Sequence, residues 1–224
     1  STASARTTTG VQGPYLLRGS SPGVAAVGPS ADVAAAAAPV VAPRRISVAA
    51  QFDATLRERE QEALAEAGSR PAPLTAPAIA GAPPIVGEVK SFKVCTNLQC
   101  SAFGSVAATA RFVGEHAAIY LDNTVPAASP LQDADLVELG VAFDTFHYVI
   151  DTTAFGRESD IDGNGRVIIL MTDAVTALTP DCTTGRVIGY FYGGDLFSGS
   201  NSNLGEIFYT LVPAPPTTLC PAGA

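Results

Sequence analysis

The sequence has few of the residues that a nucleic-acid-binding protein needs. It contains 13 lysines and arginines against 21 aspartates and glutamates in 224 residues, which gives a formal net charge of −8 at pH 7. Binding to nucleic acid relies on basic surfaces that neutralise phosphates. Because the longest basic cluster is Arg44-Arg45, the composition argues against a nucleic-acid partner.

Long apolar runs are also missing. The longest nearly apolar run, from Val33 to Pro43, contains a proline, whereas a helix that crosses a bilayer needs about 20 residues. The sequence therefore predicts no transmembrane span of its own.

Large side chains are scarce in the first part of the chain. Of its 10 phenylalanines and 6 tyrosines, only Tyr15 and Phe52 precede Lys90. We expect an extended low-complexity arm over residues 1–45, a short helix over 46–69, a proline-rich linker over 70–84 and an α/β domain over 85–224. The helix is predicted from the spacing of Phe52, Leu56 and Leu64. Together with Tyr15 these side chains are the expected contacts of the arm and helix with a partner.

The rest of the chain alternates between strand-like and helical patterns. One main helix should begin near Ser129-Pro130, with a core stripe of Leu136, Leu139, Phe143, Phe146 and Tyr148. Short β-branched and aromatic runs predict six strands, at Val86–Val94, Phe103–Val113, Ala117–Leu121, Val167–Met171, Val187–Tyr192 and Ile207–Val212. This pattern predicts an α+β or α/β fold with a small mixed sheet.

Four cysteines favour a disulfide framework. Three pairings are possible, and we favour Cys95–Cys100 with Cys182–Cys220 because the first pair encloses a predicted turn between two strand-like runs. A zinc site is the alternative, but the cysteines lack the paired two-residue spacing of such sites. Disulfides imply an oxidising compartment, so we expect an exported protein, periplasmic or extracellular. The opening at Ser1, without a methionine or a hydrophobic signal, is typical of a trimmed amino terminus.

One loop has the spacing of a calcium site. Asp160, Asp162 and Asn164 occupy loop positions 1, 3 and 5, and Gly165 occupies position 6, as in the first half of an EF-hand loop. Position 12 is Met171, so a further ligand would come from Asp173 or from the carbonyl of Arg166. The alternative is a turn without an ion, whose side chains bond to their own backbone. Calcium is thus the one cofactor that the sequence suggests.

Catalytic patterns are hard to find. The chain has two histidines, His116 and His147, and neither lies in a His-Glu-x-x-His segment. Nothing matches the strand-to-helix turn that carries a nucleophilic serine. The sequence therefore predicts no complete active site, and we expect the chain as it stands not to be an enzyme.

Several segments in the second half resemble the hyicolysin-type zinc metallopeptidases. The resemblance covers about residues 85–213. The segments that carry it are Ala142–Phe146, Phe155–Gly165, Val167–Asp173, Gly189–Phe191, Asp195–Phe197, Ser202-Asn203 and Glu206–Tyr209.

The resemblance implies that these segments form the amino-terminal, sheet-rich part of a protease-like domain. In that family the next element would be a helix whose His-Glu-x-x-His supplies two zinc ligands and a general base. This sequence contains no such segment, so no catalytic residue carries over and no zinc is expected in this chain.

Two functions are consistent with these observations. The first is an exported, non-catalytic structural or assembly subunit that binds a protein partner or a multi-subunit complex, such as a photosynthetic or respiratory membrane complex, through its arm and its protease-like domain. The alternative is the amino-terminal part of a secreted zinc metallopeptidase whose active-site helix lies downstream.

Overall fold

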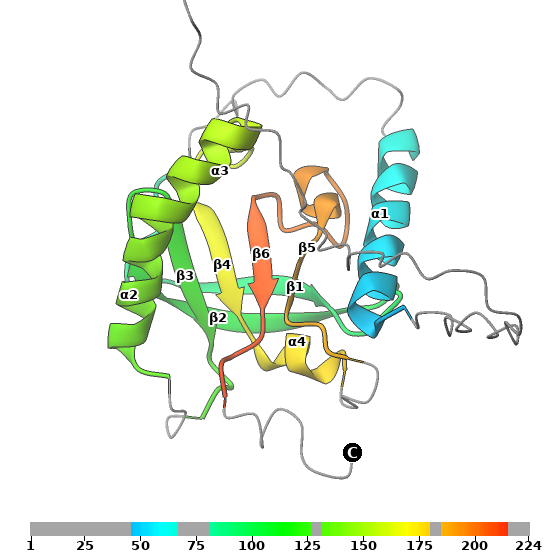
Figure 1. Cartoon of the computed structure of the whole chain (residues 1–224), viewed down its shortest axis with the longest axis horizontal. Coiled ribbons are helices and arrows are strands. Elements are labelled where there is room, and N and C mark those ends of the chain that lie inside the picture. Colours follow the sequence, from blue (N-terminus) through cyan, green and yellow to red (C-terminus); the bar gives the residue numbers. More distant parts are fainter. Residues whose placement is uncertain (1–45, 67–80, 127–130, 180–184, 215–224) are drawn as a thin grey trace, which may run out of the picture. The chain divides into compact units, whose positions relative to one another are not determined.

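The computed structural model describes residues 46–66, 81–126, 131–179 and 185–214. Within these ranges, six strands form one sheet with the order β1-β2-β3-β4-β6-β5 (Figure 1). The predicted α+β fold with a mixed sheet of about six strands is confirmed. The strands are β1 (Val89–Cys95), β2 (Phe103–Val113), β3 (Ala117–Asp122), β4 (Val167–Met171), β5 (Gly189–Phe191) and β6 (Ile207–Thr210).

The sheet combines an antiparallel half with a parallel centre. β1, β2 and β3 form an antiparallel meander, β3 pairs in parallel with β4, and β4 pairs in parallel with β6. β5 closes the other edge, antiparallel to β6. A strand between two parallel neighbours is covered on both faces, which explains why β4 is an uninterrupted apolar run with four buried residues.

The two faces of the sheet carry separate apolar clusters. Side chains alternate along each strand, so Ile168 and Leu170 of β4 face one cluster and Ile169 and Met171 face the other. Helix α1 (Val48–Glu66) and helix α4 (Asp173–Ala177) contribute to the first cluster. Helix α2 (Asp133–Ala142) contributes Leu136 to the second.

The predicted main helix is longer and less regular than its pattern suggests. α2 continues through a π-helical turn (Phe143–His147) into α3 (Tyr148–Phe155). The carboxylate of Asp144 accepts hydrogen bonds from the backbone N–H groups of Glu115, His116 and Ala117. This clamp fixes the π-helical turn against the β2–β3 connection.

Two details of that helix differ from the prediction. It begins at Asp133 rather than near Ser129-Pro130, because Gln132 and Asp135 form a capping box at its start; residues 127–130 lie outside the described residues. The expected core stripe is only partly buried: Leu136 and Tyr148 are buried, whereas Leu139 and Phe146 are exposed. A π-helical turn inserts an extra residue, which rotates the following side chains away from a simple helical stripe.

Candidate functional site

An acidic group lies at one end of the parallel strands. The loop between α3 and β4 carries Asp160 and Asp162, and Glu206 immediately precedes β6. Because the starts of neighbouring parallel strands meet at the same edge of a sheet, the fold brings the three carboxylates together. One oxygen from each lies within 4.8 Å of one oxygen from each of the others.

The loop is held by its own hydrogen bonds. The backbone N–H of Gly165 donates to Asp160 Oδ1 over 2.8 Å, and Asn164 Nδ2 donates to Asp162 Oδ2 over 2.6 Å. Glu206 is 6% exposed, and its Oε1 accepts hydrogen bonds from Ser159 Oγ and from the N–H of Ile161. Burial raises the pKa of Asp162, although the hydrogen bonds from Asn164 act in the opposite direction.

The predicted metal ligands are only partly brought together. Asp160 and Asp162 lie in the acidic group, and Asn164 lies beside them with its Oδ1 accepting a hydrogen bond from the N–H of Arg166. Arg166 directs its guanidinium to the carbonyl of Gly165. Asp173 is exposed in the first turn of α4, beyond the opposite end of β4. A five-residue strand such as β4 spans about 16 Å, so Asp173 lies too far from the loop to share an ion with it. The third carboxylate of the acidic group comes from Glu206 instead.

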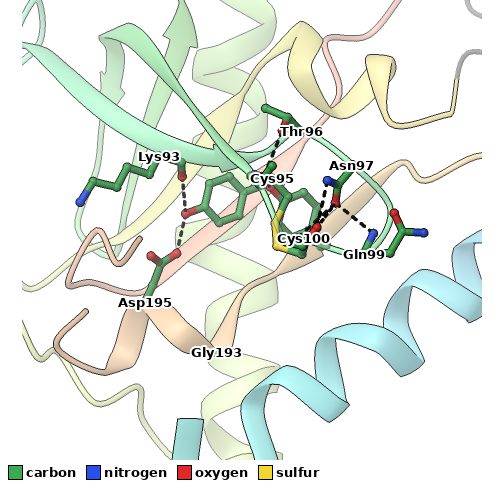
Figure 2. Close-up of a disulfide and its surroundings, with 12 residues drawn as sticks. Lys93, Cys95, Thr96, Asn97, Gln99, Cys100, Gly193 and Asp195 are labelled. Carbon is green, nitrogen blue, oxygen red and sulfur yellow. Dashed lines mark hydrogen bonds between the residues drawn. A yellow bond between two sulfur atoms is a disulfide. The ribbon is translucent and has the colours of Figure 1, made fainter. Parts of the chain in front are cut away.

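The first predicted disulfide is present. Cys95 at the end of β1 is bonded to Cys100, and both residues are buried (Figure 2). Inside the enclosed turn, Asn97 Oδ1 accepts hydrogen bonds from the N–H groups of Gln99 and Ser101. Cys182 and Cys220 lie outside the described residues, so their pairing stays a prediction.

We expect the double variant Cys95→Ala/Cys100→Ala to lower the free energy of unfolding by about 2 kcal/mol, because a short disulfide-closed loop removes that much chain entropy from the unfolded state. Chemical denaturation under oxidising conditions measures the change. The variant Cys182→Ala/Cys220→Ala is the matched comparison for the second predicted pair. Equal stability of Cys95→Ala/Cys100→Ala and the wild type would contradict a stabilising role for the Cys95–Cys100 bond.

A buried polar network lies beside this disulfide. Asp195, which has no exposed surface, accepts hydrogen bonds from the Tyr209 hydroxyl and from the N–H of Asn203. Asn203 Nδ2 in turn donates to the carbonyl of Lys93. Lys93 and Asp195 lie close together in Figure 2. Burial raises the pKa of Asp195 to about 6, although these hydrogen bonds and the charge of Lys93 lower it. The network joins the 193–205 segment to β1 and β6.

An apolar groove crosses the sheet face that α2 leaves uncovered. It has a volume of about 720 Å³, within the range of ligand pockets, and lies between the α2–α3 helix and strands β4 and β6. A second hollow adjoins it and shares Leu139, Met171 and Pro213. On its strand side, Phe208 is 42% exposed and Ile188 is 68% exposed. Both side chains contribute to one continuous apolar lining, which distinguishes them from apolar residues scattered singly over a surface.

The residues expected to contact a partner lie elsewhere. Phe52 and Leu56 of α1 are 2% and 1% exposed and belong to the core of this chain, so their assignment to a partner contact is corrected. The reason is that the apolar face of α1 packs against Tyr190 of β5, next to which α1 lies (Figure 1). Leu64 is exposed, and Tyr15 lies outside the described residues.

The two histidines have different surroundings. His116 stacks on the ring of Tyr148, with centroids 3.8 Å apart. His147 is exposed and lines the apolar groove together with Phe143 and Asp151. The groove is not predicted from the sequence, because helical spacing places Leu139 and Phe143 in the core, whereas Leu139 is exposed and Phe143 is only half-buried in the structure.

Comparisons with known proteins do not identify a family. No protein-family model matches the chain, and the search of curated proteins found no match. The resemblance to hyicolysin-type metallopeptidases therefore remains a prediction from the quoted segments. Among the described helices, none is both long enough and apolar enough to span a bilayer.

Proposed function

We propose that this chain is an exported, non-catalytic subunit that binds a larger protein assembly through its protease-like domain. The observation that carries the proposal is the apolar groove, where Phe208 and Ile188 are exposed beside the α2–α3 helix. The Cys95–Cys100 disulfide favours an oxidising compartment. The lack of a His-Glu-x-x-His segment in the sequence supports a binding role over catalysis.

The groove also favours a particular kind of partner segment. Its lining is mostly apolar, with Asp151 in the groove and Asp135 in the adjoining hollow, and the whole chain carries a formal charge of −8. An amphipathic helix laid into a groove buries its apolar face and keeps its polar flanks in water. We therefore expect a partner helix with apolar residues on one face and basic residues at its flanks.

Replacing Phe208 with aspartate should abolish partner binding and leave the domain folded, because the substitution places a charge on an apolar contact surface. The tagged full-length chain is purified from its native source, and the amount of each copurifying protein relative to the chain is compared between variants. Val89→Asp is the matched control, since Val89 is also an exposed apolar strand residue, on β1. Deletion of residues 1–45 leaves α1 in place and tests the arm separately.

Equal recovery of the same stoichiometric partner with Phe208→Asp and with Val89→Asp would contradict the groove as the binding surface. Thermal melting of both variants controls for folding. A partner that is lost only on deletion of residues 1–45 would assign binding to the arm alone.

A second candidate is the amino-terminal part of a secreted zinc metallopeptidase. One observation favours it: Leu211 and Pro213, which follow β6, line the groove. The resemblance implies that the element after β6 is an active-site helix. In a longer chain, such a helix would lie in this groove. The intact mass of the native protein decides between the candidates. A larger mass together with chelator-sensitive peptidase activity would support the protease, whereas a mass equal to the 224-residue chain would support the subunit.

A further inference from the structure

The acidic group at the start of β4 and β6 has the spacing of ligands that share one ion. Calcium binds carboxylate oxygens at about 2.3–2.6 Å, so two ligands of one ion lie at most about 5 Å apart. The three carboxylates meet this limit, since one oxygen from each of Asp160, Asp162 and Glu206 lies within 4.8 Å of the others. Asp160 and Asp162 come from one loop, whereas Glu206 comes from a segment more than 40 residues later.

Glu206 gives an independent sign of a missing ligand. The residue is 6% exposed, and its Oε2 is buried without a hydrogen-bond partner, whereas its Oε1 already accepts two hydrogen bonds. A buried charged oxygen that bonds to nothing is costly. A cation at the acidic group would satisfy this oxygen.

Neighbouring side chains balance the negative charge of the group only in part, because Lys90 acts on Asp162 electrostatically without forming an ion pair with it. Within the described part of the chain, no lysine, arginine or histidine forms an ion pair with any of the three carboxylates. Lys90 lines the small cavity that contains Asp162, but its ammonium lies over the ring of Phe92. A bound divalent ion would offset the repulsion among the three carboxylates.

We infer that Asp160, Asp162 and Glu206 bind a calcium ion that ties the α3–β4 loop to the start of β6. All the proposed ligands are oxygen atoms, which calcium prefers over the nitrogen and sulfur atoms that zinc uses. The adjoining cavity, about 200 Å³ in volume, leaves room for water ligands. An irregular set of ligands from two segments suits calcium better than magnesium, which demands near-ideal octahedral geometry. The inference does not depend on the proposed function.

The test uses the full-length chain with its disulfides intact, freed of metal by chelation. Calcium chloride is titrated from about 10⁻⁷ to 10⁻² M by calorimetry, a range that covers known calcium modules. We expect one calcium per chain. At a free calcium concentration about 100 times Kd, the melting temperature should rise by about 5 to 10 °C. Magnesium should give a clearly smaller rise, and an equal rise would overturn the assignment to calcium.

Two variants test the ligands. Glu206→Gln and Asp160→Asn should each weaken calcium binding at least tenfold, whereas Glu115→Gln, a largely exposed acid on the β2–β3 connection, should bind like the wild type. Glutamine keeps an oxygen for the bonds from Ser159 and Ile161 while removing the unpaired charge. Glu206→Gln should therefore melt at or above the wild-type temperature in chelator and below it in calcium. If Glu206 had only a structural role, the order of the two melting temperatures would be the same in chelator and in calcium.

Terbium luminescence provides a measurement on the unmodified chain. Tyr120 lines the same cavity as Asp162, so terbium bound there should emit on excitation of tyrosine, and calcium should displace it. The signal should be retained in Glu115→Gln and lost in Asp160→Asn. The inference is overturned if calcium gives no heat of binding and the melting curves in calcium and in chelator coincide.

Discussion

Replacing Phe52 with alanine is expected to lower the free energy of unfolding by about 3–5 kcal/mol, the usual cost of removing a buried aromatic ring. Phe52 is 2% exposed and packs edge-to-face on Tyr190 of β5, with ring centroids 5.2 Å apart. Leu56, which is 1% exposed, packs in the same core cluster. Two hydrogen bonds also hold α1: Arg57 donates to the carbonyl of Phe191, and Glu60 accepts from the N–H of Gly193. Urea denaturation of the full-length chain measures the loss.

Leu64→Ala is the matched control for this prediction. Leu64 lies on the same helix but is 41% exposed, and surface substitutions usually change stability by less than about 0.5 kcal/mol. If Phe52→Ala costs no more than Leu64→Ala, α1 does not belong to the domain core. In that case Phe52 and Leu56 would again be available to a partner, as their spacing alone suggested.

The strands were predictable because their signal is local. β2 and β4 match the predicted ranges Phe103–Val113 and Val167–Met171, since alternating or continuous apolar runs reflect burial on one or two faces. The order of the strands is not local information. That β6 lies between β4 and β5 depends on long-range pairing, which no single run of residues encodes.

The same distinction explains the acidic group. The spacing of Asp160 and Asp162 identified the loop, because alternate residues of one turn converge on one point. Glu206 was missed because it reaches the loop only through the parallel pairing of β4 with β6. The available signal was the position of Glu206 directly before a predicted strand. That position indicates a metal ligand only when the pairing of this strand with β4 is known.

The burial of helices follows this pattern too. The spacing of Phe52 and Leu56 indicates that one face of α1 is covered, but not which surface covers it. The exposure of Phe146 depends on the π-helical turn, which Asp144 stabilises through three backbone N–H groups of another segment. Helical periodicity contains no information about that contact.

Ionisation of Asp195 is expected to destabilise the folded chain as the pH rises. The pKa of this buried carboxyl is raised from 3.8 to about 6, so the folded state holds the proton more tightly than the unfolded chain. The resulting stabilisation is complete below about pH 4 and is lost as the pH rises through about 6. A shift of this size corresponds to at most about 3 kcal/mol.

Asp195→Asn tests this expectation, because asparagine resembles the neutral acid. Its carbonyl oxygen can accept the hydrogen bonds from Asn203, and the Tyr209 hydroxyl can accept from the new amide while donating to the carbonyl of Lys93, which lies 3.4 Å away. Between pH 4 and pH 8, the unfolding free energy of the variant should therefore gain up to about 3 kcal/mol relative to the wild type. Urea denaturation at intervals across this range measures the difference.

The comparison isolates Asp195 because the other acids with raised pKa values titrate in both proteins. The raised pKa values of Asp162 and Asp173 change the stability of the wild type and the variant alike, so their contributions cancel in the difference. Parallel stability curves for the two proteins would show that Asp195 keeps the same charge in the folded and unfolded states across this range. The hydrogen bonds from Tyr209 and Asn203 would then balance the effect of burial, and above about pH 5 the 193–205 segment would be held to β1 and β6 by an ionised carboxylate.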